Sequence, residues 1–173
     1  IVDAHQANTI LDYMRAGDLP VETLQAEEKL VILDQDQAYT LDGAFDPQRM
    51  IALLRQETEQ AVERGFTALR VTGEMTWALR GIAGSERLIE YEHCLNDFLP
   101  DSRCLALCQY DRRRFDANVL LDVLRTHPVA VVGTAMYDNF YYIPPQDLLG
   151  PTPEQAQLDH WLRALKEHRR MQD

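Results

Sequence analysis

One short segment of the sequence carries side chains suited to binding a small molecule. The residues concerned are Glu74, Trp77 and Arg80, which offer a carboxylate, an indole and a guanidinium. A carboxylate can accept hydrogen bonds, and an indole can form the wall of an apolar pocket. The segment therefore predicts part of a ligand-binding pocket. The alternative is that Glu74 pairs with Arg80 and that Trp77 belongs to the core.

A second such segment, residues 108–114, combines a thiol, a phenol and three guanidiniums. Because arginine side chains can clamp an anion, Tyr110 and Arg112 are candidate ligand-binding residues. In an acidic chain the arginines can instead form ion pairs with nearby acids such as Asp111. A redox sensor at Cys108 is a weaker hypothesis, because a thiol inside a buried strand is unreactive.

The third candidate segment is rich in aromatic residues and spans residues 137–145. It predicts either a ligand wall that includes Tyr137 or an edge strand packed against a terminal helix.

Familiar patterns for phosphate, acyl-transfer and metal chemistry are absent from the sequence. It contains no G-x-x-x-x-G-K-[ST], no G-x-G-x-x-G and no G-x-S-x-G. His93 and Cys94 are adjacent, so they point to different sides of a helix, and the other histidines are scattered. We therefore expect no catalytic residues, no cofactor and no metal site.

Charge and composition exclude several classes of partner. The chain has 173 residues, and its 17 Lys and Arg against 28 Asp and Glu give a formal net charge of -11, which repels nucleic acids and anionic membranes. No apolar run approaches the roughly 20 residues of a membrane-spanning helix. The three cysteines form an odd set without C-x-x-C spacing, which is typical of reduced thiols. We therefore predict a cytoplasmic protein with neither a nucleic-acid nor a membrane partner.

Apolar runs and helical patterns alternate along the chain. The runs predict strands that are buried on both faces at residues 29–34, 66–71, 103–110 and 128–132. Helical patterns lie at residues 8–15, 46–65, 85–98 and 116–124. This order predicts an α/β fold with a mainly parallel sheet, and ligands bind such sheets beyond the carboxyl ends of the strands. Asp3 and His5 join the candidates there, because Ile1 and Val2 resemble the end of a strand.

Residues 152–173 form a separate unit after the predicted domain of residues 1–151. A helical apolar stripe runs along Leu158, Trp161, Leu162 and Leu165. This helix either packs back on its own domain or passes a signal to a following one through a short coiled-coil seam.

Five stretches of sequence carry a family likeness: residues 70–79, 89–92, 107–111, 126–128 and 139–145. In this order they resemble the MEDS domain, a methanogen/methylotroph, DcmR-type sensory domain, with a likeness that covers residues 1–151. The resemblance implies a non-catalytic input domain that senses a small molecule, and a one-carbon or halogenated compound is the expected ligand. It also implies a downstream module, such as a histidine kinase, a PAS domain or a DNA-binding domain.

MEDS domains are regarded as distant relatives of the RecA and KaiC ATPases. This implies a RecA-like three-layer domain, here without its first strand and helix. Asp3-Ala4 stands where KaiC-type domains have an acidic pair, and Gly73 stands where they have the aspartate that holds magnesium. We therefore expect the fold without the ATPase activity. Two alternatives stay open: a nucleotide-binding ATPase whose phosphate loop lies outside this sequence, and a homodimerising interaction module.

Overall fold

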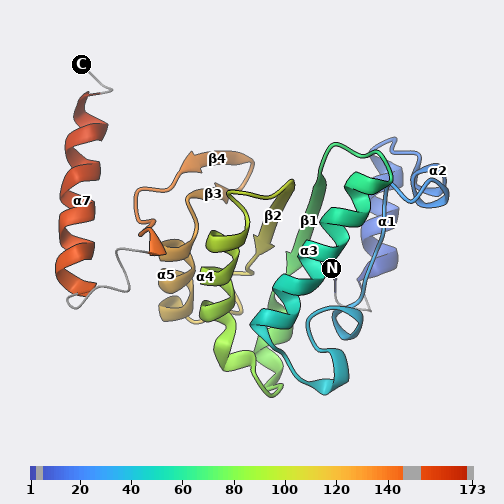
Figure 1. The fold of residues 1–173 in the computed structure, drawn as a ribbon, viewed down its shortest axis with the longest axis horizontal. Coiled ribbons are helices and arrows are strands. Elements are labelled where there is room, and N and C mark those ends of the chain that lie inside the picture. Colours follow the sequence, from blue (N-terminus) through green and yellow to red (C-terminus); the bar gives the residue numbers. More distant parts are fainter. Residues whose placement is uncertain (3–5, 146–152, 171–173) are drawn as a thin grey trace.

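The computed structural model describes residues 1–2, 6–145 and 153–170 (Figure 1). At its centre lie two parallel strands, β1 (Leu69–Glu74) and β2 (Cys104–Gln109), paired in register from Leu69 opposite Cys104 to Glu74 opposite Gln109. Because the strands run in the same direction, Glu74 and Gln109 end at the same edge. None of the helices in the described ranges is long and apolar enough to cross a membrane.

The first two residues extend this pair on the β1 side. The Ile1 ammonium donates to the Thr72 carbonyl at 2.6 Å, and the Glu74 N–H donates to the Ile1 carbonyl at 3.1 Å. On its other side, Val2 donates to the Leu33 carbonyl at 3.0 Å. The chain start therefore lies between β1 and residues 33–34, as the end of a parallel strand would.

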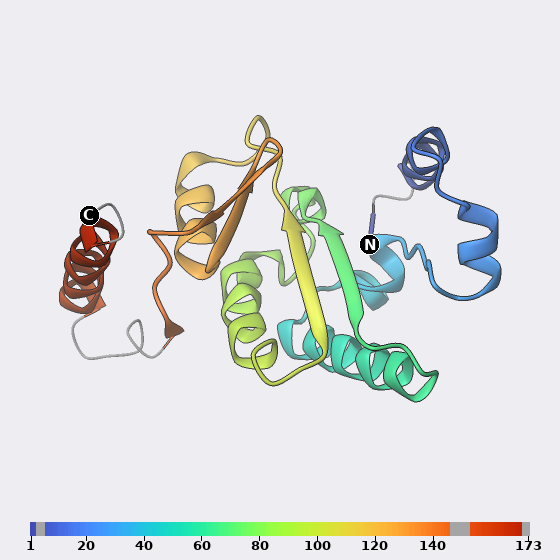
Figure 2. The same cartoon turned by 90° about the horizontal axis from the view of Figure 1, so that it is seen from above.

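Helices cover one face of the central strands. Figure 2 shows α3 (Pro47–Glu63) and α4 (Leu88–Phe98) on one side of β1 and β2, and α5 (Ala117–Thr126) packs beside α4. The opposite face carries Leu105 and Leu107, which are 59% and 44% exposed. The prediction of strands buried on both faces is therefore wrong for the described residues, because side chains of a strand alternate between its faces and these helices lie on one face only.

The sequence signals of α3 are all present in the structure. The Asp46 carboxylate accepts a hydrogen bond from the Arg49 N–H at 2.8 Å, and Pro47 occupies the first turn. Gly65, with φ of 91°, follows the helix. The predicted helix over residues 46–65 is confirmed, as are the helices predicted at residues 8–15, 85–98 and 116–124, within a few residues at their ends.

The predicted strand at residues 29–34 is not formed. Residues 30–33 have no regular structure, Val31 is 63% exposed, and the pairing is limited to one parallel bridge between Val2 and Asp34. An apolar run becomes a buried strand only when a neighbour pairs along its length, and Val2 offers a single position. The run follows two helices, α1 (Ala7–Ala16) and α2 (Val21–Ala26).

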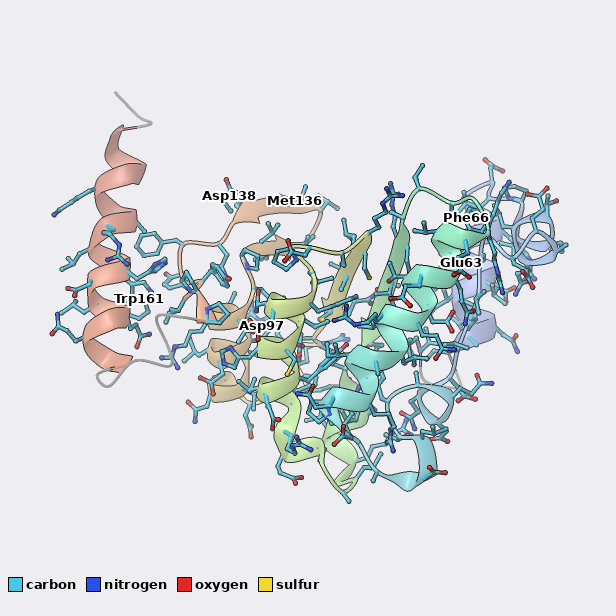
Figure 3. All side chains as sticks on the ribbon, viewed as in Figure 1. Glu63, Phe66, Asp97, Met136, Asp138 and Trp161 are labelled. Carbon is cyan, nitrogen blue, oxygen red and sulfur yellow. The ribbon has the colours of Figure 1, made fainter. Side chains whose placement is uncertain are left out.

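The last two strands form a hairpin apart from the parallel pair. β3 (Val129–Val132) pairs antiparallel with β4 (Ala135–Asp138) around a tight turn at Gly133, whose φ is 64°. Figure 3 labels Met136 and Asp138 on this hairpin. The prediction of a parallel strand at residues 128–132 is therefore corrected, because the glycine lets the chain reverse at once. The segment 137–145, for which an edge strand was one expectation, is a strand only at its start: Tyr137 and Asp138 belong to β4, and residues 139–143 form a turn and irregular structure.

Short 3₁₀ turns connect the main elements. They are η1 (Gln35–Gln37), η2 (Leu41–Gly43), η3 (Thr76–Arg80) and η4 (Ser85–Arg87). The last helix, α7 (Pro153–Arg170), stands beside the hairpin end of the molecule (Figure 1). Its Trp161 meets the ring of Tyr141 edge-on, with centroids 6.3 Å apart.

Candidate functional site

A cluster of buried polar side chains lies near the carboxyl end of β2. Glu92 is at its centre and is only 1% exposed. One carboxylate oxygen accepts a hydrogen bond from the Tyr110 hydroxyl. The other lies 3.5 Å from the Cys108 sulfur and 3.3 Å from Nε2 of His127. These four side chains, Glu92, Cys108, Tyr110 and His127, are called the Glu92 cluster below.

Three elements bring the Glu92 cluster together. Glu92 lies on the face of α4 that packs against the core, Cys108 lies on the helix-facing side of β2, and His127 follows α5 directly. The Asn96 amide ties α4 to α5, because it donates to the carbonyls of Glu92 at 2.9 Å and Thr126 at 2.6 Å. The cluster is thus held by α4, β2 and the end of α5.

The end of α5 is also tied to the hairpin. The Asn139 amide donates to the carbonyls of Leu124 at 2.6 Å and His127 at 2.7 Å, and the Ile143 N–H donates to the Arg125 carbonyl at 2.8 Å. The last carbonyls of a helix have no partner within it, so these side-chain and backbone donors satisfy them. They also fix the position of His127.

The two ring nitrogens of His127 have different partners. Nδ1 lies 2.7 Å from the Val123 carbonyl, which can only accept, so Nδ1 carries a proton. Nε2 therefore faces the Glu92 carboxylate. Burial acts to lower the pKa of His127. The hydrogen bond and charge of Glu92, together with the Val123 carbonyl, raise it by more, so the pKa lies above the usual 6.5.

The other two members of the Glu92 cluster stay protonated over a wide pH range. Burial raises the pKa of Cys108 well above its ordinary value, and the charge of Glu92 adds to that shift. Burial and the same negative charge raise the pKa of Tyr110. In the protein without added ions, the thiol and the phenol are therefore neutral hydrogen-bond donors to Glu92.

Beside this cluster lies a group of aromatic rings. Trp77 stacks on Tyr39 with centroids 4.9 Å apart and an interplanar angle of 19°, and Phe45 lies 4.5 Å from Trp77. Tyr91 meets Tyr39 and Phe45 edge-on. Trp77 is 1% exposed, and its Nε1 has no hydrogen-bond partner among the residues that the structure describes.

Gly73 is required by the close approach of Tyr39. A Cβ atom at residue 73 would lie 1.9 Å from the Tyr39 hydroxyl oxygen and 3.1 Å from its ring carbon Cζ. Tyr39 is 3% exposed and has little room to move. Any side chain at residue 73 therefore conflicts with this packing.

The structure distributes the predicted site residues over several places. Glu74 lies at the end of β1 and accepts hydrogen bonds from the Thr76 N–H at 3.0 Å and hydroxyl at 2.5 Å. Trp77 and Tyr110 lie near the same edge, Trp77 inside the core. Arg80 and Arg112 are exposed. That these residues bind a ligand stays a prediction.

Three further candidates lie elsewhere. Tyr137 is 54% exposed on β4, while Asp3 and His5 lie outside the described residues. Of the arginines in the turn after β2, Arg113 pairs with Asp111 at 2.8 Å and holds the pKa of that carboxyl at about 2. This is the ion pair that the sequence offered as the alternative to an anion clamp.

A hollow of about 390 Å³ lies at the opposite end of the sheet from the predicted pocket. It is lined by α3 and α4 together with residues 101–103, which precede β2. Since parallel α/β sheets bind ligands at the carboxyl ends of their strands, we assign the candidate site to the other edge, around Trp77 and the Glu92 cluster.

Glu92 and His127 were not among the residues predicted from sequence. They lie 16 residues before and 19 residues after Cys108, so no local spacing connects the three. Two signals were available. Glu92 shares the buried face of α4 with Leu88 and Leu95, at helical spacing, and a carboxylate on such a face requires a buried partner. The stretches 89–92, 107–111 and 126–128, which carry the family likeness, also contain all four members of the cluster.

Comparison with known proteins gives a consistent picture. The transcriptional repressor DcmR of Methylorubrum extorquens (strain DSM 6343 / CIP 106787 / DM4) is 34% identical over 79 residues, which make up 45% of this chain and 30% of the repressor. No solved structure matches the chain, so the RecA-like three-layer fold stays a prediction. The family model described as the MEthanogen/methylotroph, DcmR Sensory domain matches residues 1–128. The chain therefore belongs to the MEDS family of sensory domains.

Proposed function

We propose that this chain is a non-catalytic input domain that binds a small molecule at the carboxyl edge of β1 and β2 and passes the change to an output module. Family membership and the likeness to a transcriptional repressor support a sensory, regulatory role. One observation carries the position of the ligand: the Trp77 N–H is a buried donor at this edge without a described partner. A buried donor without a partner costs about 1–3 kcal/mol, so a ligand that places an acceptor atom there removes this cost and is bound more tightly.

The surroundings of this donor limit the ligand's chemistry. Tyr39 and Phe45 pack against the indole, and Tyr91 meets both of these rings edge-on. A site of this kind suits a small, mostly apolar molecule with one hydrogen-bond acceptor. This matches the one-carbon or halogenated compound that the family resemblance implies.

The packing of Tyr39 supports a role without nucleotide hydrolysis. In KaiC-type domains, an aspartate that holds magnesium follows the strand at the position of Gly73. Here the Tyr39 hydroxyl fills the space that any Cβ at residue 73 would need. A magnesium carboxylate therefore does not fit at this position, which favours the sensory function over the ATPase alternative.

The output path in this proposal runs through the hairpin to α7. Asn139 links the end of α5 to the hairpin, and Tyr141 contacts Trp161 on α7. Leu158, Leu162 and Leu165 on α7 are 46% to 56% exposed and are free to contact a downstream module. A ligand that favours one arrangement of the site would thereby change the position of α7.

The two tryptophans of the chain provide the test. Trp161→Phe leaves Trp77 as the fluorescent reporter, and Trp77→Phe is the matched control that reports from α7. We expect methanol, formaldehyde or dichloromethane to produce a saturable change in Trp77 emission in the first variant. If none of these probes changes it while Mg-ATP binds tightly in calorimetry, the ATPase alternative is correct instead.

A further inference from the structure

The Glu92 cluster presents three potential metal ligands of three chemical kinds. The Glu92 carboxylate, the Cys108 sulfur and His127 each offer one ligand atom, and these atoms lie within 4.8 Å of one another. In tetrahedral zinc sites the bonds are about 2.3 Å to sulfur and about 2.0 Å to nitrogen or oxygen, so ligand atoms stand roughly 3.3–3.5 Å apart. The distances from Glu92 Oε2, 3.5 Å to Cys108 Sγ and 3.3 Å to His127 Nε2, match these edges.

The orientation of His127 also fits a ligand. Its Nδ1–H donates to the Val123 carbonyl at 2.7 Å, which leaves Nε2 for Glu92, 3.3 Å away. Metal-binding histidines usually donate their second ring N–H to a carbonyl or carboxylate in this way. An unprotonated Nε2 would otherwise place its lone pair against the carboxylate, so the position needs either a proton or a metal ion between the two groups.

The charges of these groups suit a divalent ion. A thiolate, a neutral imidazole, a carboxylate and a divalent ion sum to zero, so the occupied site would carry no unpaired buried charge.

On this geometry we propose that Glu92, Cys108 and His127 bind a divalent transition-metal ion of the zinc class, with a fourth coordination position open. A mixed sulfur, nitrogen and oxygen donor set suits borderline-soft ions such as Zn²⁺ and Co²⁺ rather than Mg²⁺ or Ca²⁺. Tyr110 holds the second carboxylate oxygen and orients the ligand. His127, 24% exposed, provides the route by which the ion enters. The metal site is independent of the ligand at Trp77.

Cobalt is the spectroscopic probe for this site. The full chain, with its thiols reduced and trace metals removed, is titrated with Co²⁺ and then with Zn²⁺. We expect one Co²⁺ per chain, with visible d–d bands of a tetrahedral ion and a thiolate-to-cobalt charge-transfer band in the near ultraviolet. Zn²⁺ should displace the Co²⁺ and abolish these bands, because it binds such sites more tightly.

The variants assign the ligands. Cys108→Ser should abolish the charge-transfer band, and His127→Gln should weaken Co²⁺ binding by at least about 10-fold. Cys104→Ser is the matched control, because Cys104 lies on the same strand and the same face but is outside the cluster. Circular dichroism of each variant checks that it folds.

X-ray absorption of the zinc-loaded wild-type chain gives a readout that needs no variant. One sulfur at about 2.3 Å, with nitrogen or oxygen atoms near 2.0 Å, is the expected first shell. A zinc shell without sulfur overturns the proposal, as does the absence of stoichiometric Co²⁺ binding. Binding that is unchanged in both folded variants, Cys108→Ser and His127→Gln, overturns it as well. None of these results depends on whether Trp77 reports a small molecule.

Discussion

At the scale of single residues, Glu92 determines the chemistry of the interior. It is an ionisable side chain that is 1% exposed, and it is tolerated because Tyr110, Cys108 and His127 surround it with donors. Removing one partner leaves a buried charge undercompensated. The nearby Gly73 has a different importance, since its lack of a side chain makes room for Tyr39.

The protonation of His127 predicts how stability depends on pH. Its pKa in the folded chain is raised above 6.5, so the folded state binds the proton more tightly than the unfolded chain does. This stabilisation is fully present below about pH 6.5 and is lost as pH rises through the raised pKa. Urea unfolding of the metal-free chain between pH 5 and 9 should show the decline.

Two variants identify the group responsible for that decline. His127→Gln removes the titrating ring and Glu92→Gln removes the charge that raises its pKa. His127→Gln should flatten the change in unfolding free energy over this range. Glu92→Gln should abolish or reverse the decline, because burial, which lowers the pKa of His127, is then opposed only by the Val123 carbonyl. An identical pH dependence in the wild type and both variants would assign the effect to other groups.

Gly73→Ala should destabilise the chain by about 1–3 kcal/mol, because the added Cβ overlaps the buried Tyr39 hydroxyl. The control is Gly17→Ala, whose Cβ would come no closer than 3.5 Å to other atoms and should change the unfolding free energy by less than about 1 kcal/mol. Adding Tyr39→Phe to Gly73→Ala should recover part of the loss. Equal urea midpoints for the Gly73 and Gly17 variants would contradict the steric account.

At the scale of elements, local sequence signals were enough to predict a helix where residues at its ends fix the backbone conformation. Asp46, Pro47 and Gly65 predicted α3 because capping, a fixed φ and a positive φ are local properties. The apolar run at residues 30–33 gave a wrong prediction of a strand, since strand pairing depends on a neighbour that is distant in the sequence. The hairpin was missed because an apolar run does not reveal the direction of its partner. The Glu92 cluster was missed because its side chains come from three separate elements.

Asp46 provides the test of that local account. Asp46→Ala removes the hydrogen bond to the Arg49 N–H and should lower the unfolding free energy by about 1 kcal/mol. Asp46→Asn keeps a capping oxygen and loses only the exposed ion pair with Arg87, so it should stay within about 0.5 kcal/mol of the wild type. Thermal or urea unfolding distinguishes the two, and equal losses would show that the ion pair matters more than the cap.

At the scale of the whole molecule, the core and α7 are unequally attached. The core holds α3, α4 and the aromatic rings around Trp77, whereas the described contacts of α7 include one ring pair, Tyr141 with Trp161. Leu158, Leu162 and Leu165 of α7 remain about half exposed, whereas Trp161 is partly buried. Gln157 of α7 lines a small hollow together with residues of α4 and α5. Whether α7 is an output helix or packs back on its own domain stays open to test.

Replacing Leu158, Leu162 and Leu165 together by Gln tests this distinction. If the apolar stripe of α7 faces outward, the unfolding free energy of the domain should change by less than about 1 kcal/mol. A loss of several kcal/mol, as for core leucines, would mean that the stripe packs against the domain. Light scattering of the wild type and the triple variant shows whether the stripe also joins two copies.

The register of β1 and β2 has a consequence for how the chain avoids misfolding. One face of the β1–β2 pair is exposed and carries both apolar and polar residues. On that face, a shift of the pairing by one residue would cost little free energy. On the helix side the same slip would replace Cys108 by Leu107 or Gln109 beside Glu92. A similar slip of β1 would bring a bulky residue against Tyr39 in place of Gly73. Cys108 on β2 and Gly73 on β1 therefore each favour the native register. We expect shifted pairings to be less stable because of the conflicts at these two positions.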